Sequence, residues 1–253
     1  MSAPAVNLVG ANVARYVSQF VLLLLILRTQ SPRTAGVFVL AMAIATPLFR
    51  LSELGSRSIY VTHKREYGIR AFLLLLAAST TFALVTVSGA TASFGWVPTG
   101  LMVLVALNKM AEVFLIFWGG PLQVRGQTPR ILRIYVLNAT ATIAAAGVGL
   151  LIFDDLLLAL LGSLLASVMC VWLMGRQADR SADGEGSVLT SAGALARDGL
   201  PMGLAAAMIT LVSTVPQYGL AAAVGPLRRR GSPSRSTRSS RSRCSCTRWP
   251  RRG

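Results

Sequence analysis

The residues of this chain that could do chemistry are charged side chains placed inside apolar stretches. Lys109 and Glu112 lie one helical turn apart near the middle of PTGLMVLVALNKMAEVFLIFWGG. A charge in the middle of a membrane helix costs at least about 2.5 kcal/mol on insertion scales, so it normally has a partner or a role. Two interpretations follow: the pair lines a polar cavity, with Asn108 on an adjoining face, or the two side chains only pair with each other.

A second polar stripe lies in the first apolar stretch. Asn12, Arg15 and Gln19 follow one another at i, i+3 and i+7, so they share one face of a helix. Arg15 could extend its head group to the membrane surface, but that behaviour does not explain Asn12 and Gln19. The pattern favours a face that borders a cavity.

A third stripe ends the second apolar stretch, AGVFVLAMAIATPLFRLSELGSRSIYV. Arg50, Glu53 and Arg57 again lie at i, i+3 and i+7, and a continuous helix would place them on one face. They are either a ladder of ion pairs near the cytoplasmic headgroups or part of a substrate path. Pro47, just before them, permits a kink that widens a cytoplasmic mouth.

The elements that must position these side chains are membrane helices. The 253 residues are 53% hydrophobic, with a mean hydropathy of +0.60 and one His, a composition that does not fit a soluble enzyme. A helix of about 20 apolar residues crosses the bilayer core. Seven stretches approach that length: Leu8 to Leu27, Gly36 to Val61, Ile69 to Gly89, Pro98 to Gly119, Ile131 to Phe153, Leu156 to Met174 and Leu200 to Val224.

The sequence therefore predicts an all-α membrane protein, a bundle of about seven transmembrane helices. Its small-residue runs ATIAAAGVG and GSLLAS indicate close helix packing. We expect no enzyme, no catalytic residue, no cofactor and no metal. The pair Asp154 and Asp155 could suggest an acidic metal site, as in lipid-linked glycosyltransferases, but a hydrophilic turn accounts for it better.

Basic residues in the short loops predict the orientation, because such residues favour the cytoplasmic side. Two loops that share one side carry six of them: Lys64, Arg65, Arg70, Arg125, Arg130 and Arg133. Arg28 and Arg33 are on the opposite side, where they are outnumbered. The amino terminus is therefore expected in the cytoplasm, with the chain crossing the membrane several times.

The formal net charge of +16 is concentrated at one end of the chain. Residues 228–252 hold ten Arg and no acid, directly after an Ala- and Val-rich helix. A shifted reading frame in a GC-rich gene produces such a tail, and we interpret it so. An Arg/Ser arm that binds phosphate or nucleic acid is the alternative, but we expect no nucleic-acid partner for the protein.

Three stretches resemble polysaccharide flippases of the Wzx type, in the superfamily that also holds MATE exporters and the lipid II flippase. The second apolar stretch is similar in its Gly36 entry and its exit at Leu54 to Arg57. The stretch LNKMAEVFLIFWGGPLQVRGQ places Lys109, Glu112 and Gln123 at spacings familiar from the fourth helix of that family, although Ile116 stands where Asp is often found. The stretch GLPMGLAAAMITLVSTVPQYGLAAAVGP resembles the start of the second lobe.

The resemblance implies a division of the chain and a function. Residues 1–175 are expected to form a six-helix lobe, 176–198 a cytoplasmic linker, 199–226 the first helix of a second lobe, and 227–253 the tail. Two such lobes would carry a polyprenyl-diphosphate-linked oligosaccharide across a bacterial plasma membrane in polysaccharide or lipopolysaccharide synthesis. With a single lobe, the chain as written is expected to be inactive, because alternating access needs two bodies that rock against each other.

Within that scheme the cationic residues are the candidates for the path of the diphosphate or sugar. The substrate-path candidates are Arg15, Arg50, Arg57 and Lys109, and the supporting polar residues are Asn12, Gln19, Glu53, Glu112 and Gln123. The implied partners are membrane lipid, the lipid-linked oligosaccharide, a polysaccharide polymerase and other proteins of the pathway. A MATE-type exporter of small molecules and a membrane scaffold without transport remain alternatives.

Overall fold

The computed structural model describes residues 3–62, 68–95, 97–178 and 192–212, and these residues are helical with no strand among them. Within these described residues, seven helical spans are long and apolar enough to cross a membrane, with α2 and α3 together forming one span (Pro32–Thr62), which confirms the predicted all-α membrane fold. The helices are α1 (Ala3–Thr29), α2 (Pro32–Ser52), α3 (Ser56–Thr62), α4 (Ile69–Phe94), α5 (Thr99–Val124), α6 (Thr128–Leu151), α7 (Leu156–Ala178) and the unlabelled helix Ala192–Val212.

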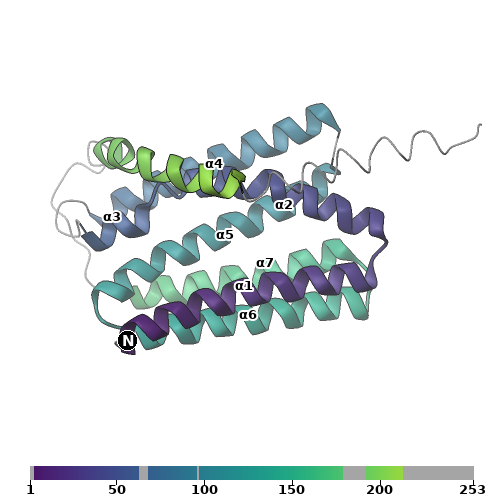
Figure 1. The fold of residues 1–253 in the computed structure, drawn as a ribbon, viewed down its shortest axis with the longest axis horizontal. Coiled ribbons are helices and arrows are strands. Elements are labelled where there is room, and N and C mark those ends of the chain that lie inside the picture. The colour runs from purple at the N-terminus through teal and green to yellow at the C-terminus, as the bar shows by residue number, and fades with distance from the viewer. Residues whose placement is uncertain (1–2, 63–67, 96, 179–191, 213–253) are drawn as a thin grey trace, which may run out of the picture.

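Helix α5 runs through the middle of the bundle and separates two groups of helices (Figure 1). On one side α1 packs along α6, α6 packs along α7, and α7 returns to α5. On the other side α2, α3 and α4 contact α5, and α2 also contacts α4. The two groups meet mainly through α5, because α1 and α2 make little contact with each other. A space between α1 and α2 is therefore lined by α5.

The second apolar stretch is two helices rather than the single helix that the charge spacing implied. Leu54 and Gly55 lie between the end of α2 and the start of α3, and both have positive φ angles, +50° and +59°. Helix α2 continues through Pro47, so the break lies beyond the predicted kink. Arg50 and Arg57 consequently belong to different helices, and the expected continuous stripe is wrong.

The helix Ala192–Val212 packs against this break. A side chain at Gly199 would place its Cβ 2.5 Å from the backbone oxygen of Leu54, so only glycine permits the approach. The helix begins inside the segment expected as a linker (176–198), and α7 extends into that segment to Ala178. The sequence predicted that this helix starts at Leu200, because the charged residues Arg197 and Asp198 interrupt the apolar run before that position. Residues 213–253, including the predicted tail, lie outside the described residues.

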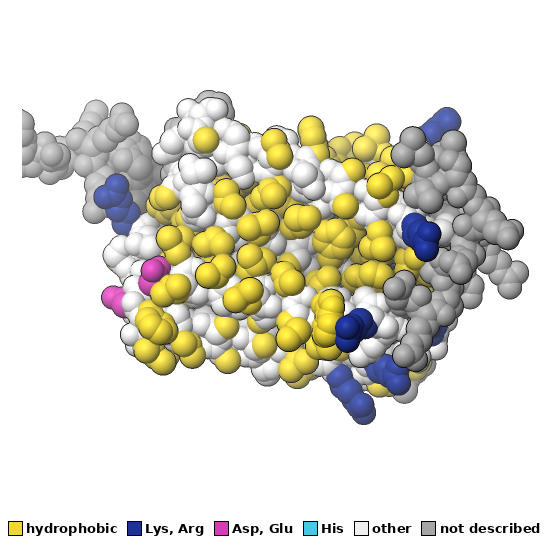
Figure 2. Space-filling model, turned by 180° about the vertical axis from the view of Figure 1, so that it is seen from behind, with side chains coloured by type: hydrophobic (Ala, Val, Ile, Leu, Met, Phe, Trp, Pro, Cys, Tyr) yellow, Lys and Arg dark blue, Asp and Glu magenta, His cyan; other side chains and the backbone are white. Residues whose placement is uncertain are grey.

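The outer surface of the bundle matches a lipid environment. Figure 2 shows a broad hydrophobic band across one face, with most of the visible Lys and Arg side chains at one end and Asp or Glu beside a further basic side chain at the other. Large apolar side chains such as Phe82, Leu165 and Ile209 are exposed within the described helices. Exposed apolar surface of this extent is normal where lipid replaces water as the surrounding medium. The protein is thus a multi-pass membrane-embedded bundle.

Helices α6 and α7 approach closely at small residues, as the runs ATIAAAGVG and GSLLAS predicted. A Cβ built on Gly149 would lie 2.5 Å from both N and Cα of Ala159. A Cβ built on Gly147, two residues earlier on the same helix, would meet nothing within 4 Å. The interface therefore needs glycine at one of these positions and not at the other.

We expect Gly149→Ala to destabilise the protein, because the added methyl group forces α6 and α7 apart. Overpacking of this kind costs about 1–3 kcal/mol. Gly147→Ala is the matched control and should leave the free energy of unfolding unchanged or slightly raised. Unfolding of both variants in mixed detergent micelles, followed by circular dichroism, measures the difference. Equal stabilities would show that the α6–α7 contact is looser than described.

Candidate functional site

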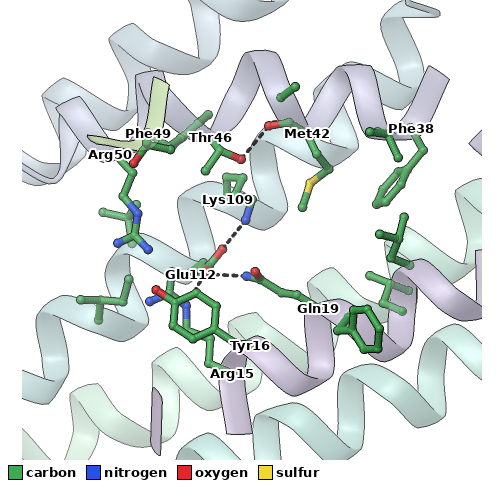
Figure 3. A pocket seen from close by; sticks show the side chains of 18 of the residues that line it. Arg15, Tyr16, Gln19, Phe38, Met42, Thr46, Phe49, Arg50, Lys109 and Glu112 are labelled. Carbon is green, nitrogen blue, oxygen red and sulfur yellow. Dashed lines mark hydrogen bonds and ion pairs between the residues drawn. The ribbon is translucent and has the colours of Figure 1, made fainter. Parts of the chain in front are cut away.

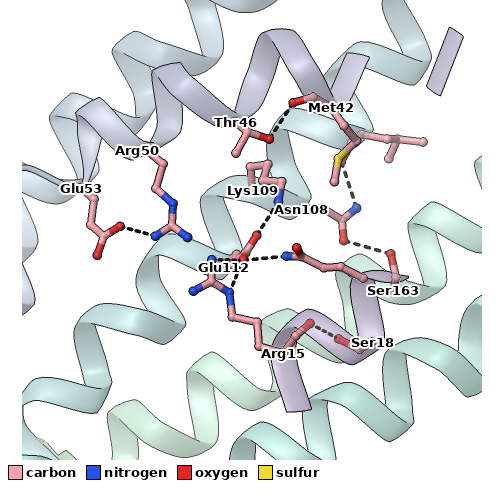
Figure 4. Close-up of polar contacts among 12 residues, drawn as sticks. Arg15, Ser18, Met42, Thr46, Arg50, Glu53, Asn108, Lys109, Glu112 and Ser163 are labelled. Atoms are coloured by element: carbon pink, nitrogen blue, oxygen red, sulfur yellow. Dashed lines mark hydrogen bonds and ion pairs between the residues drawn. The ribbon is translucent and has the colours of Figure 1, made fainter. Parts of the chain in front are cut away.

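Glu112 is the centre of a charged cluster that joins α1 to α5. Its Oε1 atom accepts from Arg15 and from Gln19, the latter over 2.8 Å, and its Oε2 atom accepts from Lys109 Nζ over 2.8 Å (Figure 4). Both Nε and Nη2 of Arg15 contact Oε1. The side chains of Arg15, Lys109 and Glu112 are 11%, 9% and 16% exposed, so the cluster is largely buried.

A second ion pair lies beside this cluster at the end of α2. Arg50 Nη1 donates to Glu53 Oε2 over 2.9 Å, one helical turn further along the chain. Figure 3 shows the Arg50 guanidinium extending from α2 into the same space as Glu112. Arg50 is also within electrostatic range of Glu112. The pair therefore adds a third cation to the region without direct contact to the carboxylate at its centre.

These charges line a cleft of about 560 Å³ between α1 and α2, with α5 as its floor. Its volume lies in the range of sites that bind small molecules or headgroups. The lining carries three cations and one carboxylate, a net charge of +2. The lining residues are Arg15, Tyr16, Gln19, Phe20, Leu22, Leu23, Phe38, Val39, Met42, Ala43, Thr46, Phe49, Arg50, Lys109, Glu112, Val113, Ile116, Ile209 and Thr210.

The cleft has a polar end and an apolar end. Arg15, Lys109 and Arg50 lie near Glu112, while Phe38 lies further along the cleft on α2 (Figure 3). Phe20 of α1 also lines the cleft. The helix Ala192–Val212 contributes Ile209 and Thr210 to the rim. A ligand with an anionic head and an apolar extension would find complementary surface along this cleft.

A smaller cavity of about 80 Å³ continues from the cluster toward α6 and α7. Asn108 donates to the backbone oxygen of Leu160 over 3.1 Å and accepts from Ser163 Oγ over 2.9 Å, which ties α5 to α7. Asn138 Oδ1 and Thr142 Oγ1 line the same cavity and have no partner among the described residues. Polar groups without partners in a cavity of this size are suited to hold water.

The sequence-predicted residues separate into those that meet at the cleft and those that do not. Arg15, Gln19, Lys109 and Glu112 meet directly, and Arg50 borders the same space with Glu53 as its partner. The alternative in which Lys109 and Glu112 only pair with each other is wrong, because Glu112 also binds two residues of α1.

Asn12, Arg57 and Gln123 lie outside the cleft. Asn12 is exposed and donates to the backbone oxygen of Leu8 in its own helix, because its position on α1 turns it away from α5. Arg57 Nη2 donates to Gln123 Oε1 over 2.9 Å, and the Arg57 side chain lies over Gly119 of α5. The break at Leu54 and Gly55 gives Arg57 this separate place on α3.

The acidic turn behaves as the hydrophilic turn that the sequence suggested. Asp155 Oδ1 accepts from the backbone N–H of Leu157 over 2.7 Å, at the start of α7. Asp154 Oδ1 accepts from Gln30 Nε2 over 2.9 Å, which joins two loops at this end of the bundle. The described residues contain no group of His, Cys, Asp and Glu that could hold a metal ion.

Sequence reasoning missed two features of the site. Arg15 and Glu112 are 97 residues apart in the chain and lie on different helices. The spacing of residues along one helix cannot reveal such a contact. The orphan pair Asn138 and Thr142 had a usable signal, because two polar residues at i and i+4 share a helix face.

Comparison with known proteins identifies no relative. No protein-family model, curated protein or solved structure matches the chain. The chemistry of the site is therefore taken from its own residues. Arg15 and Lys109 on Glu112, with Arg50 beside them, can hold an anion, and phosphate groups are anions that Arg and Lys commonly bind.

We expect Asn108→Ala to lower the free energy of unfolding, because it removes the hydrogen bonds between α5 and α7. Interhelical hydrogen bonds in membranes contribute about 0.6 kcal/mol on average and up to about 1.7 kcal/mol. Asn12→Ala is the matched control, since Asn12 bonds only within α1. Denaturation in mixed micelles compares the two variants. A larger loss for Asn12→Ala would contradict the assignment of Asn108 as the residue that joins the helices.

Proposed function

We propose that this protein is of the flippase kind of membrane transporter, in which two lobes together move a polyprenyl-diphosphate-linked oligosaccharide across the membrane. The observation that carries the proposal is the cleft between α1 and α2, whose lining holds three cations and one carboxylate inside a membrane bundle. Charged side chains inside a membrane bundle are costly, and they mark the paths of polar substrates in many membrane proteins.

The chemistry of a lipid-linked diphosphate suits the two ends of the cleft. Arg15, Lys109 and Arg50 would bind the phosphate oxygens through charge-assisted hydrogen bonds. The polyprenyl tail would remain in the lipid, next to the apolar side chains that line the rest of the cleft. The resemblance of three sequence stretches to Wzx-type flippases supports the oligosaccharide as the cargo.

The arrangement of charges at the two ends of the bundle supports a cytoplasmic amino terminus, and the bacterial plasma membrane is proposed from the resemblance to Wzx-type flippases. One end holds the start of α1 and the basic residues around α5, α6 and α7, such as Arg125, Arg133 and Arg176. The other end holds Asp154 and Asp155 together with Arg28 and Arg33. The more basic end is the one that the positive-inside rule places in the cytoplasm.

The two alternative functions fit the cleft less well. A MATE-type exporter of cationic drugs needs acidic side chains, and the single carboxylate in this cleft is already bound by Arg15, Gln19 and Lys109. A membrane scaffold without transport needs no cleft, and replacing its buried charges together with apolar residues should leave its function intact.

We expect Arg50→Gln to weaken binding of a short polyprenyl diphosphate, such as farnesyl diphosphate, to the protein in lipid nanodiscs. One lost charge-assisted hydrogen bond corresponds to about tenfold or more in the dissociation constant. Arg57→Gln is the matched control, because Arg57 is half-buried and bonded to Gln123 outside the cleft. Isothermal titration of nanodiscs with and without protein measures both affinities.

Two outcomes of this titration would contradict the proposal. Equal weakening by both substitutions would indicate general attraction of anions to a basic protein, and not binding in the cleft. Absence of binding by the wild-type protein would remove the diphosphate as a ligand. A tight complex with a cationic drug in place of the diphosphate would favour the exporter.

A further inference from the structure

We propose that Glu112 is a built-in competitor for the anionic headgroup. Its carboxylate binds Arg15 and Lys109, and a diphosphate must displace it in order to bind them. The inference rests on the proposed function and adds to it a mechanism by which the occupied site differs from the empty one.

The first observation is that Glu112 uses both carboxylate oxygens on the residues that a headgroup would need. Oε1 is bound by Arg15 and Gln19 of α1, and Oε2 is bound by Lys109 of α5. Among the described residues, no other carboxylate contacts Arg15 or Lys109. Both cations are therefore already engaged by Glu112.

The second observation concerns the charges that a bound phosphate would meet. A phosphate group and a carboxylate accept hydrogen bonds from the same donors. Two anions at hydrogen-bond distance from one pair of cations repel each other, and such like-charge contacts cost several kcal/mol at interfaces. Glu53 is paired with Arg50 beside the cleft, so the three cations and two carboxylates of the region sum to +1. Arg15 and Lys109 can therefore both contact a doubly charged group only if Glu112 withdraws from them.

The third observation is the role of the cluster in joining α1 to α5. Helix α1 packs along α6, but α1 and α5 are not among the closely packed pairs of described helices. The contacts of Arg15 and Gln19 with Glu112 therefore tie α1 to α5 through side chains, where the wall of the cleft meets its floor. When a ligand displaces Glu112, the contact between α1 and α5 runs through the ligand instead of through the Glu112 carboxylate.

The experiment compares the wild-type protein with Glu112→Gln in nanodiscs. Each is titrated with farnesyl diphosphate and, in a separate arm, with inorganic pyrophosphate, which lacks the lipid. Because the amide no longer competes for the cations, we expect Glu112→Gln to bind the diphosphate about tenfold or more tightly than wild type. Tighter binding in both arms identifies a site for the diphosphate group itself, and tighter binding of the lipid alone identifies a lipid-linked ligand.

The matched control is Asp154→Asn, which removes one negative charge at the far end of the bundle, where Asp154 bonds to Gln30. Its affinity should equal that of wild type. If Asp154→Asn also tightens binding, the effect comes from the overall charge and the proposal fails. If wild type binds and Glu112→Gln binds equally or more weakly, Glu112 is a structural partner or a ligand contact, and the proposal fails while the proposed function stands.

A further variant covers the case in which Glu112→Gln does not fold, since it leaves two buried cations without their partner. Glu112→Asp keeps the negative charge but is one methylene shorter, so its carboxylate reaches Arg15 and Lys109 less well. It should bind the diphosphate more tightly than wild type, by a smaller factor than Glu112→Gln. Unchanged or weaker binding by Glu112→Asp would contradict the proposal independently. If neither the wild-type protein nor any variant binds in either arm, both this proposal and the proposed function fail.

Discussion

The constraint on which this structure depends is that charged groups inside a membrane must be paired or hydrated. Glu112 satisfies two cations from different helices, and its own two oxygens are satisfied by them and by Gln19. Removal of one partner from such a buried pair typically costs about 3–5 kcal/mol, because the other charge is then left unpaired. The cluster thus holds α1 near α5 at a place where the two helices do not pack closely.

The organisation of the bundle follows from this arrangement. Close packing at small residues, as between Gly149 and Ala159, joins α6 to α7, while the break at Leu54 and Gly55 separates α3 from α2. Helices α1 and α2 make little contact with each other, and α5 lies between the two groups. The cleft is consequently a feature of how the helices are grouped, and its charges come from three different helices.

The sequence predicts some parts of this picture better than others. The apolar stretches predict the membrane helices well, because length and hydropathy are properties of one segment, although the start of the last helix was displaced by Arg197 and Asp198. Charged residues in the middle of apolar stretches predict a cavity, because a charge inside a membrane needs a partner or water. Spacing could not predict that Arg15 meets Glu112, since that contact depends on the packing of helices distant in sequence. It also misplaced Arg57, because the positive φ angles at Leu54 and Gly55 interrupt the helix that the spacing assumed.

The most direct test of the central claim is a measurement of distances between phosphorus and nitrogen in the bound state. The chain contains two lysines, Lys64 and Lys109, so labelling with ¹⁵N-lysine gives two ammonium signals. Solid-state NMR of the protein in phosphorus-free lipid, with farnesyl diphosphate added, detects which ammonium lies close to phosphorus. A headgroup held in the cleft predicts that the Lys109 signal is dephased by phosphorus and that Lys109→Met removes this signal. Dephasing of Lys64 alone, or of neither lysine, would contradict the claim that the charged cleft binds the diphosphate.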